Sequence, residues 1–446
     1  MTYEEAVHYI EEIPGFAKKT ELSNTRRMLE LLGDPQEQMT AVHVAGTNGK
    51  GSVCAFLTGI CIEDGWKTGT FTSPHLVELR ERIQINGQMV SEDCFAESCE
   101  RLCRIAVQMS EEGHQHPAYF EFLFGMAMDI FRREGVETAL LETGLGGRLD
   151  ATNAVEHPAV TVITSVSRDH MEYLGDTIEE IAAEKAGIIK RGVPVVYWAG
   201  DPAVMAVIED KAKEKQAETI PVSVKNYEIL KIGNKNIDFC AFCRYYENSL
   251  FSLPFSAPYQ VMNAVLALEA AACLKNRQEQ EQRFSAEVVR KGLLRSVWQG
   301  RMEEVCPGIF VDGAHNEDGV RAFIDAVKAR QETNEKYLLF SAVKEKDYEK
   351  MVRLLCEEIG WKGIILTEIE GGRRLACDIL KPLFLRYSST EVEAFPDSRT
   401  AFTAAAVKKG RTGTLYCAGS LYLAGEIKKL LRDEQAQASA QKRGET

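Results

Sequence analysis

The sequence lacks the features that would place the protein in a membrane, a secretory pathway or a nucleic-acid complex. It contains no apolar run of about 18 residues, so no segment is predicted to span a membrane. Residues 1–16 carry early acids and lack the basic-then-apolar pattern of a secretory signal. The net charge is −13, which opposes non-specific binding to nucleic acid. Together these absences predict a cytoplasmic protein.

Paired cysteine motifs are also scarce. The 12 cysteines are scattered along the chain, which is typical of reduced thiols in the cytoplasm. Cys240 and Cys243 form an isolated CxxC with no second pair and no histidine nearby, so we predict neither a metal site nor a redox site there. Cys99 and Cys103 are expected to pack in a core, and His116 is expected to lie in a solvated loop.

The sequence does contain a glycine-rich loop between an apolar, β-rich run at 41–45 and a helical pattern from Val53. Its residues are Gly46, Thr47, Asn48, Gly49, Lys50, Gly51 and Ser52. Glycines let backbone N–H groups turn toward an anion, Lys50 adds a charge, and the Ser52 hydroxyl can bind Mg²⁺. The spacing is shorter than in G-x-x-x-x-G-K-S/T, and a glycine separates Lys50 from Ser52. The strand–loop–helix context nevertheless indicates a phosphate-binding loop.

Further polar side chains stand where other predicted strands end. Glu142 ends one apolar strand, Ser73 follows a second and His170 follows a third. Because ligands in open α/β sheets bind beyond the carboxyl ends of the strands, these groups should converge on the loop. The predicted metal–phosphate site therefore comprises Ser52, Ser73, Glu142 and His170. Lys185 lies on an otherwise apolar helical face, where a lysine is costly unless it is paired or chemically modified.

Two competing nucleotide motifs fail on inspection. Gly144, Gly146 and Gly147 suggest a dinucleotide fingerprint, but Leu149 occupies the third glycine position and no acid follows at the expected distance. The run 234–238 resembles a guanine-recognition motif but has one residue too many and falls in a predicted hairpin. Neither nicotinamide nor guanine recognition is predicted.

The length suits more than one domain. Residues 1–296 are predicted to form an α/β domain around the loop. From residue 297 the strand–helix alternation restarts and continues to 432, which predicts a second, smaller doubly wound sheet. Residues 433–446 are polar without periodicity and are predicted to be a disordered tail.

In its sequence motifs the chain resembles the folylpolyglutamate synthase/dihydrofolate synthase family of the Mur ligase superfamily. The resemblance covers about residues 2–430. The motifs that carry it are 43–52, 72–76, 81–83, 142–153, 169–170, 184–187, 298–301 and 312–316. It implies a P-loop NTPase-like Mur ligase central domain and a smaller Rossmann-like C-terminal domain.

The resemblance also implies an activity. Such enzymes are ATP-dependent ligases in which ATP phosphorylates a carboxylate, the amino group of L-glutamate attacks the acyl phosphate, and phosphate leaves. The acceptor would be a folate, dihydropteroate or both. The ligand would lie between the domains, whose closure would gate the chemistry.

Several residue roles follow from the same resemblance. Ser52 and Glu142 would bind one Mg²⁺, and Ser73, Glu142 and His170 would bind a second. Lys185 would be carbamylated. The expected catalytic residues are Lys50, His170, Lys185 and His315, and the expected nucleotide contacts beyond the loop are Asn263, Arg301 and Asp312. The expected substrate-binding residues are Phe120, Glu121, Leu149, Asp150 and Ala151.

The chain departs from its relatives at three positions. Many relatives have glycine at Glu21, histidine at Tyr259 and aspartate at Glu345. The departure at Glu21 bears on whether dihydropteroate is a substrate.

Two alternatives compete with this assignment. A cell-wall Mur ligase usually carries a separate N-terminal domain of about 100 residues, whereas about 40 residues precede the loop here. A P-loop ATPase switch would not need a second domain that carries Arg301, Asp312 and His315. A monomer is the default expectation.

Overall fold

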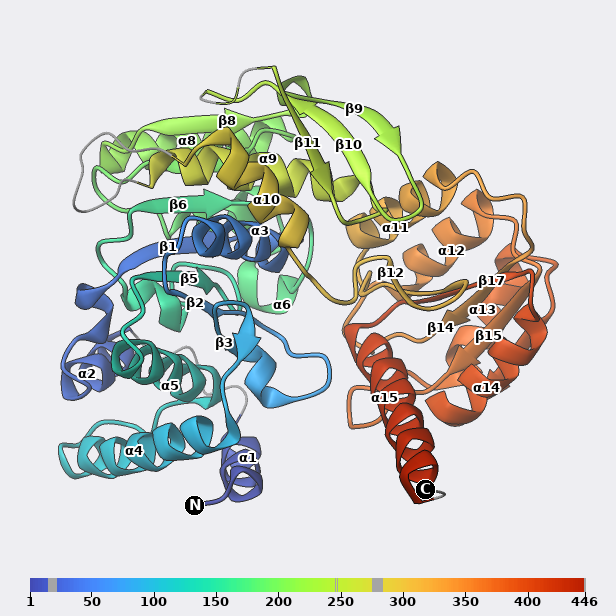
Figure 1. Cartoon of the computed structure of the whole chain (residues 1–446), viewed down its shortest axis with the longest axis horizontal. Helices are drawn as coiled ribbons and strands as arrows, with labels where there is room; N and C mark the ends of the chain where they lie inside the picture. The colour runs from blue at the N-terminus through green and yellow to red at the C-terminus, as the bar shows by residue number, and fades with distance from the viewer. Residues whose placement is uncertain (15–21, 245, 247, 275–283, 445–446) are drawn as a thin grey trace. The chain divides into compact units, whose positions relative to one another are not determined.

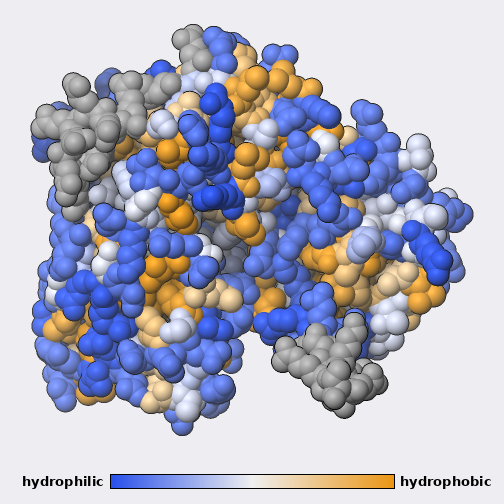
Figure 2. Space-filling view, in the orientation of Figure 1, coloured by the Kyte–Doolittle hydropathy of each residue, from blue (hydrophilic) through white to orange (hydrophobic). Residues whose placement is uncertain are grey.

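The computed structural model describes residues 1–14, 22–244, 246, 248–274 and 284–444. The chain forms two compact units (Figure 1). The first comprises Met1–Lys231, Asp238–Pro254 and Gln260–Val297, and the second comprises Ile232–Ile237, Phe255–Tyr259 and Trp298–Thr446. Among the described residues, no helix combines the length and apolarity that crossing a bilayer requires. Hydrophilic residues prevail on the face of the molecule shown in Figure 2.

An eight-stranded sheet forms the centre of the first unit. Its strands are β1 (Thr40–Ala45), β2 (Thr68–Phe71), β3 (Ile83–Ile85), β4 (Gln88–Met89), β5 (Thr138–Glu142), β6 (Val160–Ile163), β7 (Val195–Trp198) and β8 (Thr219–Val222). They lie in the order β4-β3-β2-β5-β1-β6-β7-β8. All neighbours are parallel except the β2–β3 and β3–β4 pairs, which are antiparallel. Every residue of β5 and β6 is buried, which explains their continuous apolar sequences.

The strand β1 lies between β5 and β6 (Figure 1). Val44 pairs with Glu142, and Ala45 pairs with Ile163, so the carboxyl ends of the three strands are adjacent. The chain builds β2 and β5 on one side of β1 and then crosses to β6 on the other. In open α/β sheets such a switch point opens a crevice where ligands bind.

The helices of the first unit surround this sheet. They are α1 (Tyr3–Glu12), α2 (Ser23–Leu31), α3 (Lys50–Glu63), α4 (Glu92–Glu111), α5 (Tyr119–Arg133), α6 (Met171–Leu174), α7 (Ile178–Ala186), α8 (Pro202–Lys215), α9 (Tyr259–Cys273) and α10 (Ala286–Arg295). The first residue of α9 belongs to the second unit. A separate three-stranded sheet contains β9 (Tyr227–Ile232), β10 (Ile237–Ala241) and β11 (Ser249–Leu253), in the order β11-β10-β9.

The helix that follows the glycine loop is held on all sides. Residues Gly51–Cys61 of α3 are buried, as expected for a helix that is apolar all round. α3 meets α10 at two glycines, and a Cβ atom on Gly59 would lie 2.3 Å from the backbone oxygen of Gly292. This close approach fixes α3, and with it the start of the helix at Lys50.

The second unit contains a six-stranded sheet. Its strands are β12 (Glu303–Cys306), β13 (Ile309–Val311), β14 (Lys336–Phe340), β15 (Gly363–Thr367), β16 (Val392–Phe395) and β17 (Thr414–Ala418), in the order β12-β13-β17-β14-β15-β16. Only the β12–β13 pair is antiparallel. Its helices are α11 (Glu317–Ala329), α12 (Tyr348–Glu358), α13 (Cys377–Tyr387), α14 (Ser398–Lys409) and α15 (Leu421–Gly444). The predicted α/β class and the second doubly wound sheet are confirmed.

The structure differs from the sequence predictions at several elements. Helices α8 and α13 and strands β8, β12 and β16 were not predicted. The chain passes into the second unit for the last time after Val297, beside the predicted division at 296/297, but residues 232–237 and 255–259 also belong to that unit. Local periodicity cannot reveal such discontinuous segments.

The tail predicted over residues 433–446 is instead helical as far as Gly444, because α15 continues through it. Residues 426–443 contain neither glycine nor proline and are rich in alanine, glutamine and lysine, which favour helix. A helix without a long apolar stripe gives no periodic signal. Residues 445–446 lie outside the described part of the chain.

His43 is a buried polar residue in the middle of β1. Its Nε2 atom lies 2.7 Å from Oγ1 of Thr152, and its Nδ1 atom has no hydrogen-bond partner. Burial and, secondarily, the charge of Lys190 lower the pKa of His43 to about 3. The ring is therefore neutral in the folded protein.

This burial predicts an acid-sensitive stability. Below the unfolded pKa of about 6.5 the unfolded chain binds a proton at His43 that the folded chain does not, so stability falls as the pH drops toward 3. Between pH 7 and pH 5 the loss should be about 2 kcal/mol. The free energy of unfolding of wild type and of His43→Gln would be measured by urea denaturation at several pH values. It should depend less on pH in the variant. His8→Gln, at an exposed histidine paired with Glu12, is the control, and an equal pH dependence in all three proteins would contradict the prediction.

Candidate active site

The glycine loop that follows β1 has a backbone that only glycine accommodates at two positions. Gly46 has a φ of +149°, and a Cβ atom there would lie 1.8 Å from Oγ1 of Thr164. Gly49 has a φ of +93°, and a Cβ atom there would lie 2.3 Å from Oδ1 of Asn263. A side chain that directly follows β6 and one from α9 therefore lie directly against the loop.

Residues just after β6 hold the loop in place. The backbone N–H of Thr47 donates to the Ser165 oxygen at 2.7 Å, and Oγ1 of Thr47 accepts from the backbone N–H of Ser167 at 3.0 Å. Oγ1 of Thr164 donates to the Asn48 oxygen at 2.7 Å. This supporting role of the residues after β6 was not predicted from the sequence. Its only sequence signal is the run of hydroxyl residues that directly follows the strand.

The structure brings Lys50, Glu142 and Ser73 together. Lys50 Nζ donates to the backbone oxygens of Gly46 and Thr47 at 3.2 and 3.1 Å and lies 3.8 Å from Glu142 Oε1. The other Glu142 oxygen accepts from the Ser73 backbone N–H at 3.0 Å. The carboxyl ends of β1, β2 and β5 thus supply a cation, an anion and a hydroxyl residue to one place.

Lys185 on α7 also reaches this loop. It is 3% exposed, and its Nζ donates to the Gly46 oxygen at 2.9 Å. Burial lowers its pKa to about 7, and the positive charge of Lys50 adds to the effect. Asp169 and Asp150 act in the opposite direction. A large fraction of Lys185 is therefore an uncharged amine near neutral pH.

His170 lies in the segment between β6 and α6 and has a φ of +52°. Its backbone N–H donates to Asp169 Oδ1 at 2.8 Å, and its ring Nε2 lies 3.9 Å from the same oxygen. The ring is 39% exposed, whereas the Asp169 side chain is buried. The sequence analysis named His170 as a ligand and gave Asp169 no role, although the two are adjacent.

Several buried polar atoms near the loop have no hydrogen-bond partner in the described structure. They are Ser52 Oγ, Thr143 Oγ1, Ser167 Oγ and Asn263 Oδ1. Buried polar groups are normally satisfied, so such a group points to a missing ligand, ion or water. Ser52 and Glu142 offer the oxygen donors that Mg²⁺ prefers, and the residues present therefore fit the ion. The described residues contain no cluster of three or more His, Cys, Asp or Glu side chains that could hold a metal without further ligands.

Asp150 organises the loop between β5 and β6. Its carboxylate accepts hydrogen bonds from the backbone N–H groups of Gly144 and Leu145, each at 2.9 Å, and from Thr152 N and Oγ1 at 3.1 and 2.5 Å. Burial raises its pKa above the usual range. Its neighbours differ in exposure, because Ala151 is buried and Leu149 is partly exposed.

Phe120 and Glu121 open α5 and have structural contacts. Glu121 accepts from Thr25 Oγ1 at 2.7 Å and from the Ala118 backbone N–H at 2.8 Å, so it joins α2 to the start of α5. The ring of Phe120 lies 2.8 Å from the position of a Cβ atom on Gly144. Phe120 therefore packs against the loop that Asp150 organises.

The segment 73–82 is held by its own side chains. Glu81 accepts from the backbone N–H groups of Leu76 at 2.7 Å, Val77 at 2.9 Å and Glu78 at 3.0 Å. Arg82 Nε donates to His75 Nδ1 at 2.9 Å. Burial and the Arg82 charge lower the pKa of His75 to about 4, which keeps the ring neutral. These contacts, which involve the motifs at 72–76 and 81–83, were not predicted from the sequence.

The predicted residues of the second unit gather around β13. Asp312 Oδ1 accepts from the Ala314 backbone N–H at 2.8 Å, and its Oδ2 accepts from the Met302 N–H at 2.8 Å and the Tyr259 hydroxyl at 2.9 Å. Burial raises the pKa of Asp312, and the charge of Arg301 opposes the shift.

Arg301 and His315 both contact backbone oxygens close to Asp312. Arg301 Nη1 donates to the Gly300 oxygen at 3.2 Å, and His315 Nδ1 lies 2.7 Å from the Gly313 oxygen. Asn263, the predicted nucleotide contact in the first unit, donates from Nδ2 to Gln260 Oε1 at 3.0 Å.

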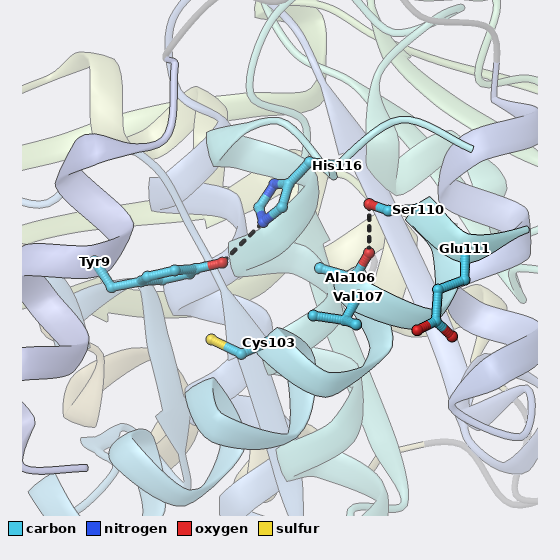
Figure 3. Close-up of a pocket in the computed structure, with 7 residues that line it drawn as sticks. All are labelled: Tyr9, Cys103, Ala106, Val107, Ser110, Glu111 and His116. Carbon is cyan, nitrogen blue, oxygen red and sulfur yellow. Dashed lines mark hydrogen bonds between the residues drawn. The ribbon is translucent and has the colours of Figure 1, made fainter. Parts of the chain in front are cut away.

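A cavity of about 360 Å³ lies elsewhere in the first unit (Figure 3). Its lining residues are Tyr9, Cys103, Ala106, Val107, Ser110, Glu111 and His116. His116 is exposed and lies in a loop, as expected, and the Tyr9 hydroxyl lies 2.9 Å from its Nε2 atom. The ring of His116 also stacks on Phe122. None of the predicted site residues lines this cavity.

The sequence model of the Mur ligase middle domain matches residues 44–271, and that of the Mur ligase glutamate ligase domain matches residues 300–421. A dihydrofolate synthase/folylpolyglutamate synthase of Bacillus subtilis is 35% identical over 438 residues, which cover 96% of this chain and 99% of the relative.

Two solved structures extend the comparison. Mycobacterium tuberculosis folylpolyglutamate synthase complexed with ADP aligns with a TM-score of 0.85 at 26% identity, over 96% of this chain and 98% of that one. E. coli FolC in complex with DHPP and ADP aligns with a TM-score of 0.82 at 25% identity, over 98% and 99% of the two chains.

A phosphate loop on a Mur ligase middle domain, followed by a glutamate ligase domain, defines an ATP-dependent ligase. The resemblance seen in the motifs is thereby confirmed at the level of fold and enzyme class. More narrowly, the chain belongs to the folylpolyglutamate synthase/dihydrofolate synthase family.

The glycine geometry predicts that Gly49→Ala weakens nucleotide binding. The new Cβ atom would collide with Asn263, and the residue would remain at φ +93°. Gly65→Ala is a matched control, because Gly65 has a φ of +89° but nothing within 4 Å of its Cβ position. Both variants should lose about 1 kcal/mol of stability from the backbone conformation. Only Gly49→Ala should weaken ADP binding, by at least about tenfold in calorimetric titration. Equal ADP affinities in the two variants would contradict the prediction.

Proposed function

We propose that this ligase joins L-glutamate to a carboxylate of a folate and converts ATP to ADP and phosphate. The observation that carries the proposal is the charge arrangement at the loop. Lys50 and Lys185 both donate to the Gly46 oxygen, and Ser52 Oγ is buried without a partner. In a chain with a net charge of −13, the Lys50 ammonium group on a glycine loop suits a polyphosphate. The family to which the chain belongs supplies the substrate class.

The chemistry suits these residues. The substrate carboxylate attacks the γ-phosphorus of ATP, and ADP leaves. The glutamate nitrogen then attacks the acyl carbon, loses a proton, and inorganic phosphate leaves with the C–O bond electrons. Lys50 and the backbone N–H groups of the loop would bind the phosphates and stabilise the charge that develops on the transferring group.

Magnesium would be held by the oxygen and nitrogen donors at the same edge of the sheet. Ser52 and Glu142 would form one site, and Ser73, Glu142 and His170 would form a second. The ion would neutralise phosphate charge and polarise the phosphoryl group. The contact between Glu142 and the Ser73 backbone supports a shared position for these two ligands.

Residues of the second unit are also proposed to contact the nucleotide and the amine. Arg301 and Asp312 would contact the nucleotide, as would Asn263 in the first unit. His315 would face the acyl phosphate or the incoming amine. The hydrogen bonds around Asp312 support a preorganised role for that carboxylate.

Dihydropteroate is proposed as a second acceptor, because the Bacillus subtilis relative is named for both activities. The acceptor would contact Phe120, Glu121, Leu149, Asp150 and Ala151. Asp150 and Glu121 would act chiefly by shaping the pocket, since their carboxylates already bind local donors. Glu21, the departure that bears on this activity, lies outside the described residues.

We further propose a monomeric cytoplasmic enzyme with functional domains at residues 1–296 and 297–432. The division of contacts at 297/298 supports the domain boundary. The twelve cysteines, all of them free, support a reducing compartment.

A product assay tests the function. Purified protein would receive Mg-ATP and L-glutamate, with tetrahydrofolate in one tube and dihydropteroate in the other, and the products would be identified by mass spectrometry. We expect a glutamyl adduct in both tubes and none with Lys50→Ala. An adduct only with tetrahydrofolate would make the enzyme a dedicated polyglutamate synthase. ATP hydrolysis without adduct in either tube would refute the proposal in favour of a switch-type ATPase.

The pKa of Lys185 predicts chemical modification. An amine with a pKa of about 7 is largely uncharged at neutral pH and can add CO₂, losing a proton and becoming a carbamate. Lys185→Ala should then lose activity that small carboxylates such as acetate partly restore. Lys190→Ala is the control, because Lys190 contacts the Asn153 oxygen and Glu156 rather than the loop. Full activity of Lys185→Ala without any added carboxylate would exclude a working carbamate.

A further inference from the structure

Tyr259 makes a defined contact in the second unit. It is the first residue of α9, and its hydroxyl donates to Oδ2 of Asp312 at 2.9 Å. The side chain packs partly buried against the apolar core of the second unit. Burial and the nearby Asp312 raise the pKa of Tyr259 well above its usual range. The phenol therefore remains a neutral hydrogen-bond donor at any pH the enzyme meets.

The donors around Asp312 fix the orientation of its carboxylate. A carboxylate offers about four acceptor positions, two on each oxygen. Among the described residues, Oδ2 accepts from Tyr259 and Met302, while Oδ1 accepts from Ala314 alone. Two donors on Oδ2 thus hold the carboxylate plane and leave one position on Oδ1. Asp312 is 3% exposed, so this position can serve only a group that enters the site.

The chemistry of that group follows from the charge of Asp312. A buried carboxylate repels phosphate but accepts hydrogen bonds strongly from neutral donors. Within a nucleotide, ribose hydroxyls are such donors, whereas the adjacent Arg301 suits the phosphates.

We propose that Tyr259 is a positioning residue for the nucleotide: its hydroxyl orients Asp312 so that Oδ1 accepts a hydrogen bond from a ribose hydroxyl. This inference rests on the proposed nucleotide role of Asp312. A histidine at this position would also supply a donor to the carboxylate, but its ring titrates near pH 6.5 whereas the phenol does not.

The test compares ADP affinity by calorimetric titration in wild type, Tyr259→Phe and Tyr259→His. Tyr259→Phe keeps the ring and removes the donor, and it should weaken ADP binding roughly tenfold, as expected for one hydrogen bond to a charged group. The KM for tetrahydrofolate should change by less than about twofold, because the folate does not contact Asp312. Tyr259→His should restore ADP affinity, with a new pH dependence around pH 6.5.

Tyr416→Phe is the matched control. Tyr416 is also buried in the second unit, and its hydroxyl donates to a carboxylate, that of Glu332, at 3.1 Å. Both phenylalanine variants should lose similar thermal stability, but Tyr416→Phe should leave ADP affinity unchanged. Equal ADP affinities in all proteins would reduce Tyr259 to a structural residue and overturn the proposal.

Two further outcomes separate this inference from the proposed function. If Asp312→Asn binds ADP as wild type does, Asp312 is not a nucleotide contact and the inference fails, even if glutamyl adducts form. If wild type binds ADP and shows the Tyr259→Phe loss but makes no adduct, the inference stands and the proposed ligase substrate is wrong.

Discussion

Two lysine side chains donate to one backbone oxygen, and the chemistry of the first unit depends on that arrangement. Lys50 and Lys185 come from α3 and α7, and both reach the Gly46 oxygen. Their mutual repulsion and the burial of Lys185 are unfavourable, and the lowered pKa of Lys185 is the measure of that cost. Bound phosphate anions, or a negative charge on Lys185 itself, would relieve the repulsion. The loop is therefore suited to bind an anion.

The fold keeps this unfavourable arrangement from relaxing. Gly46 and Gly49 lie against Thr164 and Asn263, so the loop cannot move away without losing its contacts to β6 and α9. α3 is buried on all sides and meets α10 at Gly59, which prevents Lys50 from withdrawing. Strain at a functional site persists only where the surroundings over-determine it. Here the apolar sheet and α3 are the surroundings that hold the loop and its two lysines in place.

The sequence was sufficient for features that depend on local order. The loop, the strand before it and the unusual position of Lys185 could all be predicted, because each is encoded within a few neighbouring residues. Contacts between segments that are distant in the sequence could not be predicted. Ser165 holds Thr47 across more than a hundred residues, and Tyr259 reaches Asp312 from another element. The helical continuation of α15 was missed for a different reason, since a polar helix carries no apolar period.

The acceptor site proposed at the β5–β6 loop is constrained by the hydrogen bonds of that loop. Asp150 commits both carboxylate oxygens to folding that loop, and Glu121 is committed to α2 and the start of α5. Changing either residue would leave buried donors unpaired and would alter the whole pocket rather than tune it. In the proposed acceptor site, discrimination between a folate and dihydropteroate would then come from side chains that make no such hydrogen bonds. Phe120 and Leu149 are apolar and can change in shape without breaking a hydrogen bond, so acceptor preference in this family should vary through such positions while Asp150 stays constant.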